Sequence, residues 1–115
     1  MSIAPPAEFD GPGDQWSPET LMMSAVAGCF ILSFKAVSKF SKFEWVSIDC
    51  HSEGILDRVE KTTRFVQVTN KVKLVISEDS SKEKALTLLE KAEAICLVSN
   101  SLNATLKLEC EIVVK

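Results

Sequence analysis

Hydrophobic and polar positions divide the chain into segments of different periodicity. Residues 1–16 hold prolines and glycines among scattered apolar residues, which predicts an irregular arm. A helix is predicted to begin at Pro18, because Ser17 is a good N-cap, proline fits the first turn, and Glu19 complements the helix dipole. From there to about Phe40, apolar residues occupy nearly every face of the helix. We therefore expect this helix to be buried on most sides.

The hydrophobic period then changes to two, which is typical of β-strands. Segments 45–54 and 62–76 are rich in β-branched residues and flank a charged stretch, so we expect an antiparallel pair. In the second segment the alternation places Phe65 on one face and Val68 on the other. The alternation slips near Asn70, where we expect a β-bulge.

A second helix and a third strand complete the pattern. Ser80 and Glu83 form a predicted capping box, and the following apolar positions share one helical stripe: Ala85, Leu88, Leu89, Ala92, Ile95 and Cys96. Residues 104–114 alternate again, as a half-buried strand does. We expect a single α+β domain over residues 1–115. Because three strands cannot cover a helix that is apolar all round, we expect an obligate homodimer.

Composition narrows the setting of this domain. A chain of 115 residues, 46% hydrophobic and 25% charged, has room for one core. Its net charge of −3 and its lack of Lys or Arg runs argue against nucleic acid as a partner. The longest uncharged apolar run, 20–34, is shorter than the ~20 residues that span a bilayer, so we expect no membrane helix. No basic region precedes the first apolar residues, so we expect a cytoplasmic protein.

Four cysteines carry the candidate chemistry: Cys29, Cys50, Cys96 and Cys110. No C-x-x-C occurs and only His51 could join them, so we expect no metal site. Cys29 and Cys96 should both point into the core from the two helices. Such a pair suits a peroxide-reducing enzyme, in which one thiolate attacks the O–O bond and a second thiol traps the resulting sulfenic acid as a disulfide. Two arbitrary core cysteines are more often small hydrophobic packing residues, and spacing alone does not change that expectation.

Local motifs add a family resemblance. The motifs are Ser17-Pro18-Glu19-Thr20-Leu21, Ala27-Gly28-Cys29-Phe30 and Cys96-Leu97-Val98-Ser99-Asn100-Ser101-Leu102. With the arm (Pro6-Ala7-Glu8-Phe9, Gly11-Pro12-Gly13) and Thr63-Arg64-Phe65, they make about residues 6–113 resemble the OsmC/Ohr family of osmotically inducible protein C-like organic hydroperoxide reductases. The resemblance implies an intertwined homodimer in which antiparallel sheets wrap around central helices.

The resemblance also implies an activity. Cys29 matches the family's peroxidatic cysteine, and Cys96 matches its resolving cysteine. Family members reduce organic hydroperoxides to alcohols and are recycled by external dithiols, often lipoyl groups, so we expect no bound cofactor. A catalytically weak or inactive OsmC-like dimer that binds a small apolar ligand is the alternative.

Two further residues complete the expected site. Glu19 matches a family glutamate, but a continuous helix places it about 15 Å along the axis from Cys29. Glu19 would then serve the partner subunit's Cys29, or the helix must break. The family's arginine normally lies in an N-terminal strand, whereas here no Arg or Lys precedes Lys35. Arg64 is the candidate for the cation that would lower the pKa of Cys29.

Overall fold

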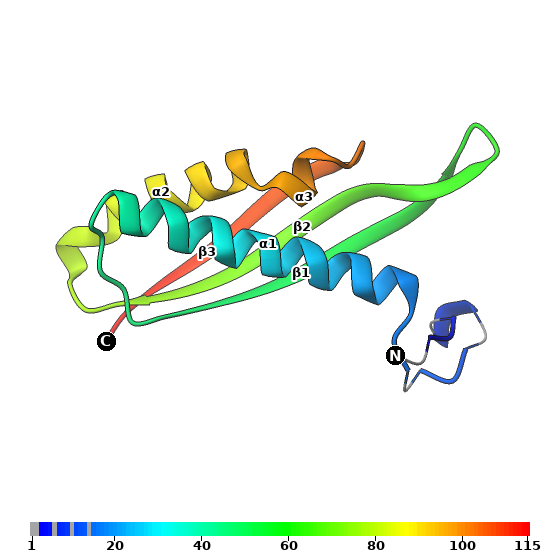
Figure 1. Cartoon of the computed structure of the whole chain (residues 1–115), viewed down its shortest axis with the longest axis horizontal. Coiled ribbons are helices and arrows are strands. Elements are labelled where there is room, and N and C mark those ends of the chain that lie inside the picture. Colours follow the sequence, from blue (N-terminus) through cyan, green and yellow to red (C-terminus); the bar gives the residue numbers. More distant parts are fainter. Residues whose placement is uncertain (1–2, 6, 10, 14) are drawn as a thin grey trace.

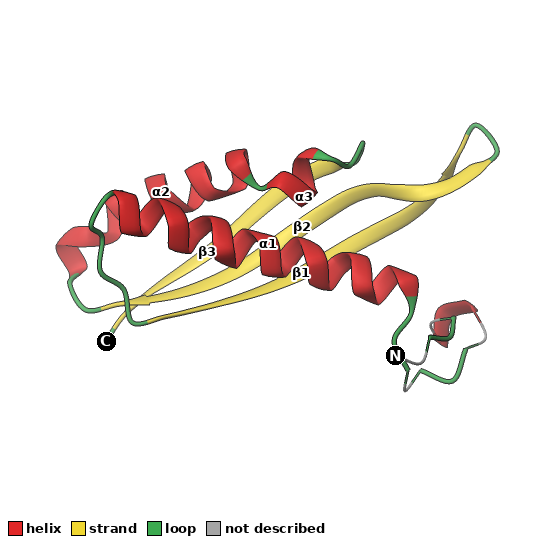
Figure 2. Cartoon of the chain, in the orientation of Figure 1, coloured by secondary structure: helices red, strands yellow, loops and turns green. Residues whose placement is uncertain are grey.

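The computed structural model describes residues 3–5, 7–9, 11–13 and 15–115 (Figure 1). Its helices are η1 (Ala7–Phe9), α1 (Pro18–Phe40), η2 (Asp79–Ser81), α2 (Lys82–Ile95) and α3 (Leu97–Asn100). Its strands are β1 (Ser47–Val59), β2 (Thr62–Ile76) and β3 (Thr105–Val114). Helices α1 and α2 lie side by side against one face of the sheet (Figure 2), which confirms the predicted α+β class.

The sheet is mixed. Its strand order is β1-β2-β3, and β1 pairs with β2 in the predicted antiparallel sense. Strand β3 pairs with β2 in parallel, so the expectation of wholly antiparallel sheets is wrong. The reason is the crossover: helix α2 carries the chain back to the starting end of β2 before β3 begins, and a parallel pair needs such a connection.

One extra residue in β2 sets which side chains face the helices. The ladder between β1 and β2 shifts register opposite Val66, not near Asn70 as predicted. The shift turns Phe65 toward α1, onto the same face as Val68, whereas simple alternation separates the two. Asn70 keeps the alternation and is buried, and the hydrogen bond that it accepts from Ser52 offsets the cost of burying its polar side chain.

The start of α1 lies where it was predicted, whereas the start and the end of α2 differ from the prediction. Ser17 caps α1 as predicted, and its hydroxyl accepts a hydrogen bond from the Thr20 N–H at 3.0 Å. The N-cap of α2 is Ser81, one residue after the predicted Ser80, and the Ser81 side chain makes no capping hydrogen bond. The Ser80 side chain of the predicted capping box lies outside the described part of the chain. Cys96 lies in the break between α2 and α3 rather than inside a helix.

Only one stripe of α1 is buried within this chain: Val26, Phe30, Phe34 and Ser38. Elsewhere on the helix, Leu32 is 66% and Phe40 is 90% exposed, so the predicted burial on most sides is not reached here. The radius of gyration is 15.9 Å, against about 13 Å for a compact domain of this length. By length and composition alone α1 could also cross a membrane. The described part of the chain thus leaves a large apolar helix surface uncovered.

The hairpin joining β1 to β2 carries local backbone strain. Its two loop residues, Glu60 and Lys61, have φ values of 50° and 68°. Two positive φ angles in a two-residue loop define a type I′ turn, which favours Asn-Gly. The left-handed region costs a residue other than glycine about 1–2 kcal/mol.

Relieving this strain should stabilise the protein. We expect Lys61→Gly to raise the free energy of unfolding by about 1 kcal/mol, measured by urea denaturation. The matched change Thr62→Gly, one residue later in β2, should lower it, because glycine weakens a strand. Equal effects of the two substitutions would contradict the turn assignment.

Candidate active site

The structure brings Cys29 and Cys96 into contact. Cys29 lies in the middle of α1 and is partly buried, whereas Cys96 is fully buried at the junction of α2 and α3. Both are free thiols, and the Cys96 side chain is near enough to Cys29 to lower the pKa of Cys29. Two thiols from separate helices are therefore close enough to react with one another.

The environment favours the thiolate of Cys29. Burial, the largest single influence, acts to raise its pKa, but several donors together lower it below its usual range. These donors are the Val98 N–H, the Cys96 thiol, the Leu97 N–H and the Ser33 hydroxyl. The two N–H groups belong to the first residues after the break at Cys96, where N–H groups lack partners within the helix. Uncharged hydrogen-bond donors thus lower the pKa of Cys29, as a cation was expected to do.

Cys96 has the opposite tendency. Burial raises its pKa, and the hydrogen bond to Cys29 and the negative charge there raise it further. Hydrogen bonds with Ser99 only partly oppose these effects. Of the two thiols, Cys29 therefore loses its proton at the lower pH, and Cys96 keeps its proton to higher pH.

The other two cysteines remain protonated. Burial raises the pKa of Cys50 to about 11, and the nearby Ser52 side chain opposes this rise only in part. Burial also raises the pKa of Cys110 to about 11, with a contribution from the carboxylates of Glu93 and Glu90. Across the described ranges, no three His, Cys, Asp or Glu side chains are placed to hold a metal ion.

Glu19 and Arg64 lie together at a different place. Both line a cavity of about 350 Å³ beside Phe65 and Asn103. The Arg64 guanidinium donates to the carbonyl oxygens of Phe65 and Asn103, at 3.3 and 3.4 Å. One carboxylate oxygen of Glu19, Oε2, is buried and accepts no hydrogen bond from any residue in the described part of the chain.

This second pair does not reach Cys29 within one chain. Helix α1 runs unbroken from Pro18 to Phe40, so Glu19 remains about 15 Å along the axis from Cys29. The possibility of a helix break is thereby removed. Arg64 is absent from the groups that lower the pKa of Cys29, so the cation expected from it is not supplied within the chain.

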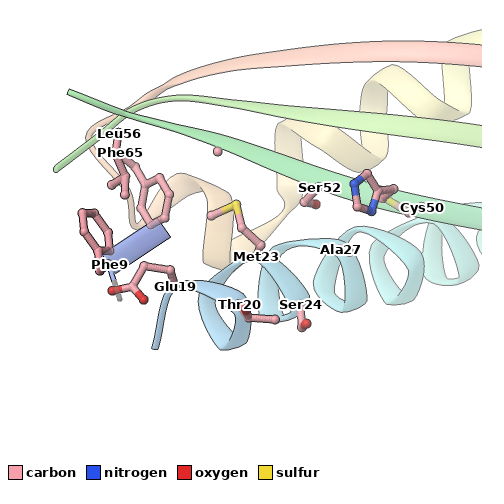
Figure 3. Close-up of a pocket in the computed structure, with 12 residues that line it drawn as sticks. Phe9, Glu19, Thr20, Met23, Ser24, Ala27, Cys50, Ser52, Leu56 and Phe65 are labelled. Atoms are coloured by element: carbon pink, nitrogen blue, oxygen red, sulfur yellow. The ribbon is translucent and has the colours of Figure 1, made fainter. Parts of the chain in front are cut away.

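A larger cavity of about 610 Å³ adjoins Glu19, between the first half of α1 and β1 (Figure 3). Sequence reasoning missed three of its lining residues: Phe9 from the arm, Gly54 in β1 and Phe65 in β2. An isolated glycine within a strand pattern often marks a close approach, so Gly54 was the available signal. Phe65 was missed because the bulge was predicted near Asn70, which placed Phe65 on the face away from Val68.

The sequence of this chain matches a known protein family. The sequence profile of OsmC-like proteins matches residues 11–111. The uncharacterized Bacillus subtilis protein YmaD is 29% identical over 117 residues, covering 99% of this chain and 78% of YmaD.

Solved structures agree. The organic hydroperoxide resistance protein OhrB of Bacillus subtilis is 26% identical, with a TM-score of 0.70 over 84% of this chain and 70% of OhrB. The organic hydroperoxide resistance protein OsmC of Legionella pneumophila is 24% identical, with a TM-score of 0.76 over 96% and 79% of the respective chains. Since the profile spans both cysteine motifs and most of the sequence, the predicted resemblance is confirmed, and this chain belongs to the OsmC-like protein family.

Proposed function

We propose that this chain is a thiol-dependent peroxidase that reduces organic hydroperoxides in the cytoplasm as a homodimer. The observation that carries the proposal is the contact between two thiols of opposite tendency, a Cys29 whose pKa is lowered and a Cys96 whose pKa is raised. In such a pair the group with the lower pKa acts as the attacking thiolate, and the group with the higher pKa stays protonated until the second step. The similarity to OhrB, named for organic hydroperoxide resistance, supports the substrate class.

The reaction proceeds in two steps on this pair. The Cys29 thiolate attacks the outer oxygen of the hydroperoxide and the O–O bond breaks. The outer O–H stays on Cys29 as its sulfenic acid, and the alkoxide takes a proton from water and leaves as the alcohol. The Cys96 thiol then attacks the sulfenic sulfur, which releases water and forms the Cys29–Cys96 disulfide. An external dithiol of lipoyl type reduces this disulfide and is itself oxidised. Because Cys96 is fully buried, we expect the dithiol to attack the Cys29 sulfur.

Two features of the single chain support the homodimer: the exposed apolar face of α1 and the distance of Glu19 from Cys29. A lone chain exposes the outer apolar face of α1, and soluble monomers rarely expose apolar patches above a few hundred Å². Among the described residues no charged group lowers the pKa of Cys29, while Glu19 and Arg64 line one cavity that holds no cysteine. In the proposed dimer, Glu19 and Arg64 of one subunit position the hydroperoxide at the partner subunit's Cys29.

The alternative is a catalytically weak or inactive dimer that binds a small apolar ligand. It is favoured by the sequence before Lys35, which has no Arg or Lys, and by the cavity of about 610 Å³ beside α1. The titration of Cys29 separates the two functions.

Alkylation by iodoacetamide at varied pH measures that titration. A thiol reacts as its thiolate, so the rate at each cysteine rises with pH and levels off above its pKa. We expect Cys29 to level off below the ordinary cysteine pKa of ~8.5, whereas Cys50 and Cys110 should react only as the pH approaches 11. Mass spectrometry of each cysteine peptide gives the rates.

Ser33 supplies the matched test of the cause. Ser33→Ala removes one donor and should move the Cys29 profile to higher pH, whereas Ser24→Ala on another face of α1 should leave it in place. A Cys29 that titrates at or above the ordinary value in the unchanged protein would favour the binding function.

Substitution of Cys29 and substitution of Cys96 should have different effects on peroxide consumption. Cys29→Ser should reduce peroxide consumption to background, because no nucleophile remains. Cys96→Ser should allow one rapid oxidation and then accumulate sulfenic or sulfinic acid at Cys29, seen by mass spectrometry. Cys110→Ser serves as a control and should retain full turnover. Undiminished activity in both Cys29→Ser and Cys96→Ser would identify them as packing residues.

Mixed dimers test whether Glu19 acts across the interface. Alone, Glu19→Gln should slow peroxide reduction about 100-fold. A mixed dimer of one Cys29→Ser chain and one Glu19→Gln chain, purified with two tags, contains one site with both groups intact. It should recover about half of the unmodified activity, because one of the two equivalent sites works. Arg64→Met in place of Glu19→Gln should behave in the same way.

The matched control pairs Cys29→Ser with Cys96→Ser. These two thiols meet within one chain, so their mixed dimer should recover nothing. No recovery with Glu19→Gln would show that Glu19 does not act across an interface. A folded monomer at micromolar concentration in sedimentation would refute the dimer itself.

A further inference from the structure

Ser99 carries a buried hydroxyl that makes no hydrogen bond of the kind that stabilises a fold. Ser99 lies in α3, three residues after Cys96, and is 0% exposed. In the described part of the chain, its Oγ has no nitrogen or oxygen partner. Three other buried serines each have a hydrogen-bond partner: Ser17, Ser38 and Ser52. Because a buried hydroxyl without a partner destabilises a protein, Ser99 indicates a role other than folding.

The group beside the Ser99 hydroxyl is the sulfur of Cys96. Cys96 is the N-cap of α3 and Ser99 is the third residue of this helix, so both belong to its first turn. The side chain of an N-cap reaches the third helical residue. Burial raises the pKa of Cys96, and the Ser99 hydroxyl and N–H both act to lower it. A hydroxyl in this place favours the thiolate form of Cys96.

The charge on Cys29 decides when Cys96 can use this hydroxyl. Burial and the thiolate of Cys29 both raise the pKa of Cys96 in the reduced protein. The first step of the proposed reaction removes that negative charge, because it converts the Cys29 thiolate to a sulfenic acid. Of the described groups that act on Cys96, Ser99 then remains to lower its pKa.

The other titratable groups around Cys96 do not change in this way. Cys50 of β1 interacts with Cys96, but burial raises the pKa of Cys50 to about 11. Glu93, one turn earlier in α2, interacts with Cys110 of β3, whose pKa burial also raises to about 11. Both of these thiols stay uncharged at neutral pH. Among the described neighbours, Cys29 is therefore the one whose charge changes during the reaction.

We infer that Ser99 is a positioning residue for the second step, and that its hydroxyl stabilises the Cys96 thiolate once Cys29 has become a sulfenic acid. The inference rests on the proposed function and deepens it. In this step the Cys96 proton passes to the sulfenic oxygen, the S–O bond breaks, the S–S bond forms, and water leaves. The Ser99 hydroxyl keeps its own proton throughout. Oxidation of Cys29 thus prepares Cys96 to react, which sets the order of the two steps.

Titration of Cys96 tests the contact without peroxide. In Cys29→Ala the neighbouring charge is absent, as it is after the first step. The Cys96 Cβ signal in carbon NMR should therefore titrate at lower pH in Cys29→Ala than in the unmodified reduced protein. Adding Ser99→Ala should raise this midpoint by about one pH unit, because a hydrogen bond to the thiolate is lost. Ser101→Ala is the matched control and should leave it in place, since Ser101 donates to the Leu97 carbonyl.

Single-turnover kinetics separates the two steps. Reduced protein is mixed with an equal amount of an alkyl hydroperoxide, quenched with acid and analysed by mass spectrometry. Ser99→Ala should leave the rate of sulfenic acid formation at Cys29 unchanged. It should slow disulfide formation about tenfold at neutral pH and move the pH profile of that step upward. Ser99→Thr keeps the hydroxyl and should retain the unmodified profile. An unchanged disulfide rate in Ser99→Ala, or equal slowing of both steps, overturns the inference.

Stability distinguishes a positioning role from a structural one. Ser99→Ala removes a hydroxyl without a nitrogen or oxygen partner, so it should not lower the free energy of unfolding of the reduced protein. Ser38→Ala removes a hydrogen bond of 2.6 Å to the Phe34 carbonyl and should lower it. Urea denaturation gives both values. A Ser99→Ala protein less stable than Ser38→Ala, or one that does not fold, would assign the hydroxyl to folding and overturn the inference.

The two proposals fail separately. If Ser99→Ala moves the titration of Cys96 but the unmodified protein consumes no peroxide, Ser99 still stabilises the Cys96 thiolate and the peroxidase proposal falls. If peroxide is consumed and neither the titration nor the disulfide rate responds to Ser99→Ala, the role of Ser99 falls and the peroxidase proposal stands.

Discussion

The structure depends on the burial of a helix that is apolar on almost every side. Within one chain the sheet and α2 cover a single stripe of α1, centred on Phe30 and Phe34. That stripe fixes the rotation of the helix, and with it the direction of every other side chain. Cys29 is turned toward the start of α3, and Glu19 toward β1 and the arm. The same packing that stabilises the layer therefore divides the site residues between two sides of one helix.

Sequence patterns predicted what local chemistry determines. The cap at Ser17, the helical stripe of α2 and the alternation of β3 all reflect interactions between residues close in the chain. They did not predict the parallel pairing of β3 or the bulge at Val66, because both depend on how distant segments meet. Burial of Asn70 interrupted the apolar alternation and drew the predicted bulge to the wrong residue.

The candidate site shows the same division. The contact of Cys29 with Cys96 follows from two apolar helix faces, which the sequence reveals. The break of α2 at Cys96 does not follow from periodicity, yet it frees the N–H groups of Leu97 and Val98 to point at the Cys29 sulfur. Because backbone N–H groups lower the pKa of Cys29, no charged residue in the sequence marks this effect. Within one chain, Arg64 donates to the carbonyl oxygen of Asn103 and is not among the groups that lower the pKa of Cys29.

The extra residue at Val66 has a consequence for how such a protein can change. Because it alone turns Phe65 inward over Gly54, deletion of one residue there would move the ring to the outer face of the sheet and widen the cavity. The thiol pair, held on the other side of α1 by α3, would keep its donors. The fold thus lets the shape of the cavity beside α1 be altered by a single-residue change in strand length, while the sulfur atoms of Cys29 and Cys96 stay where they are.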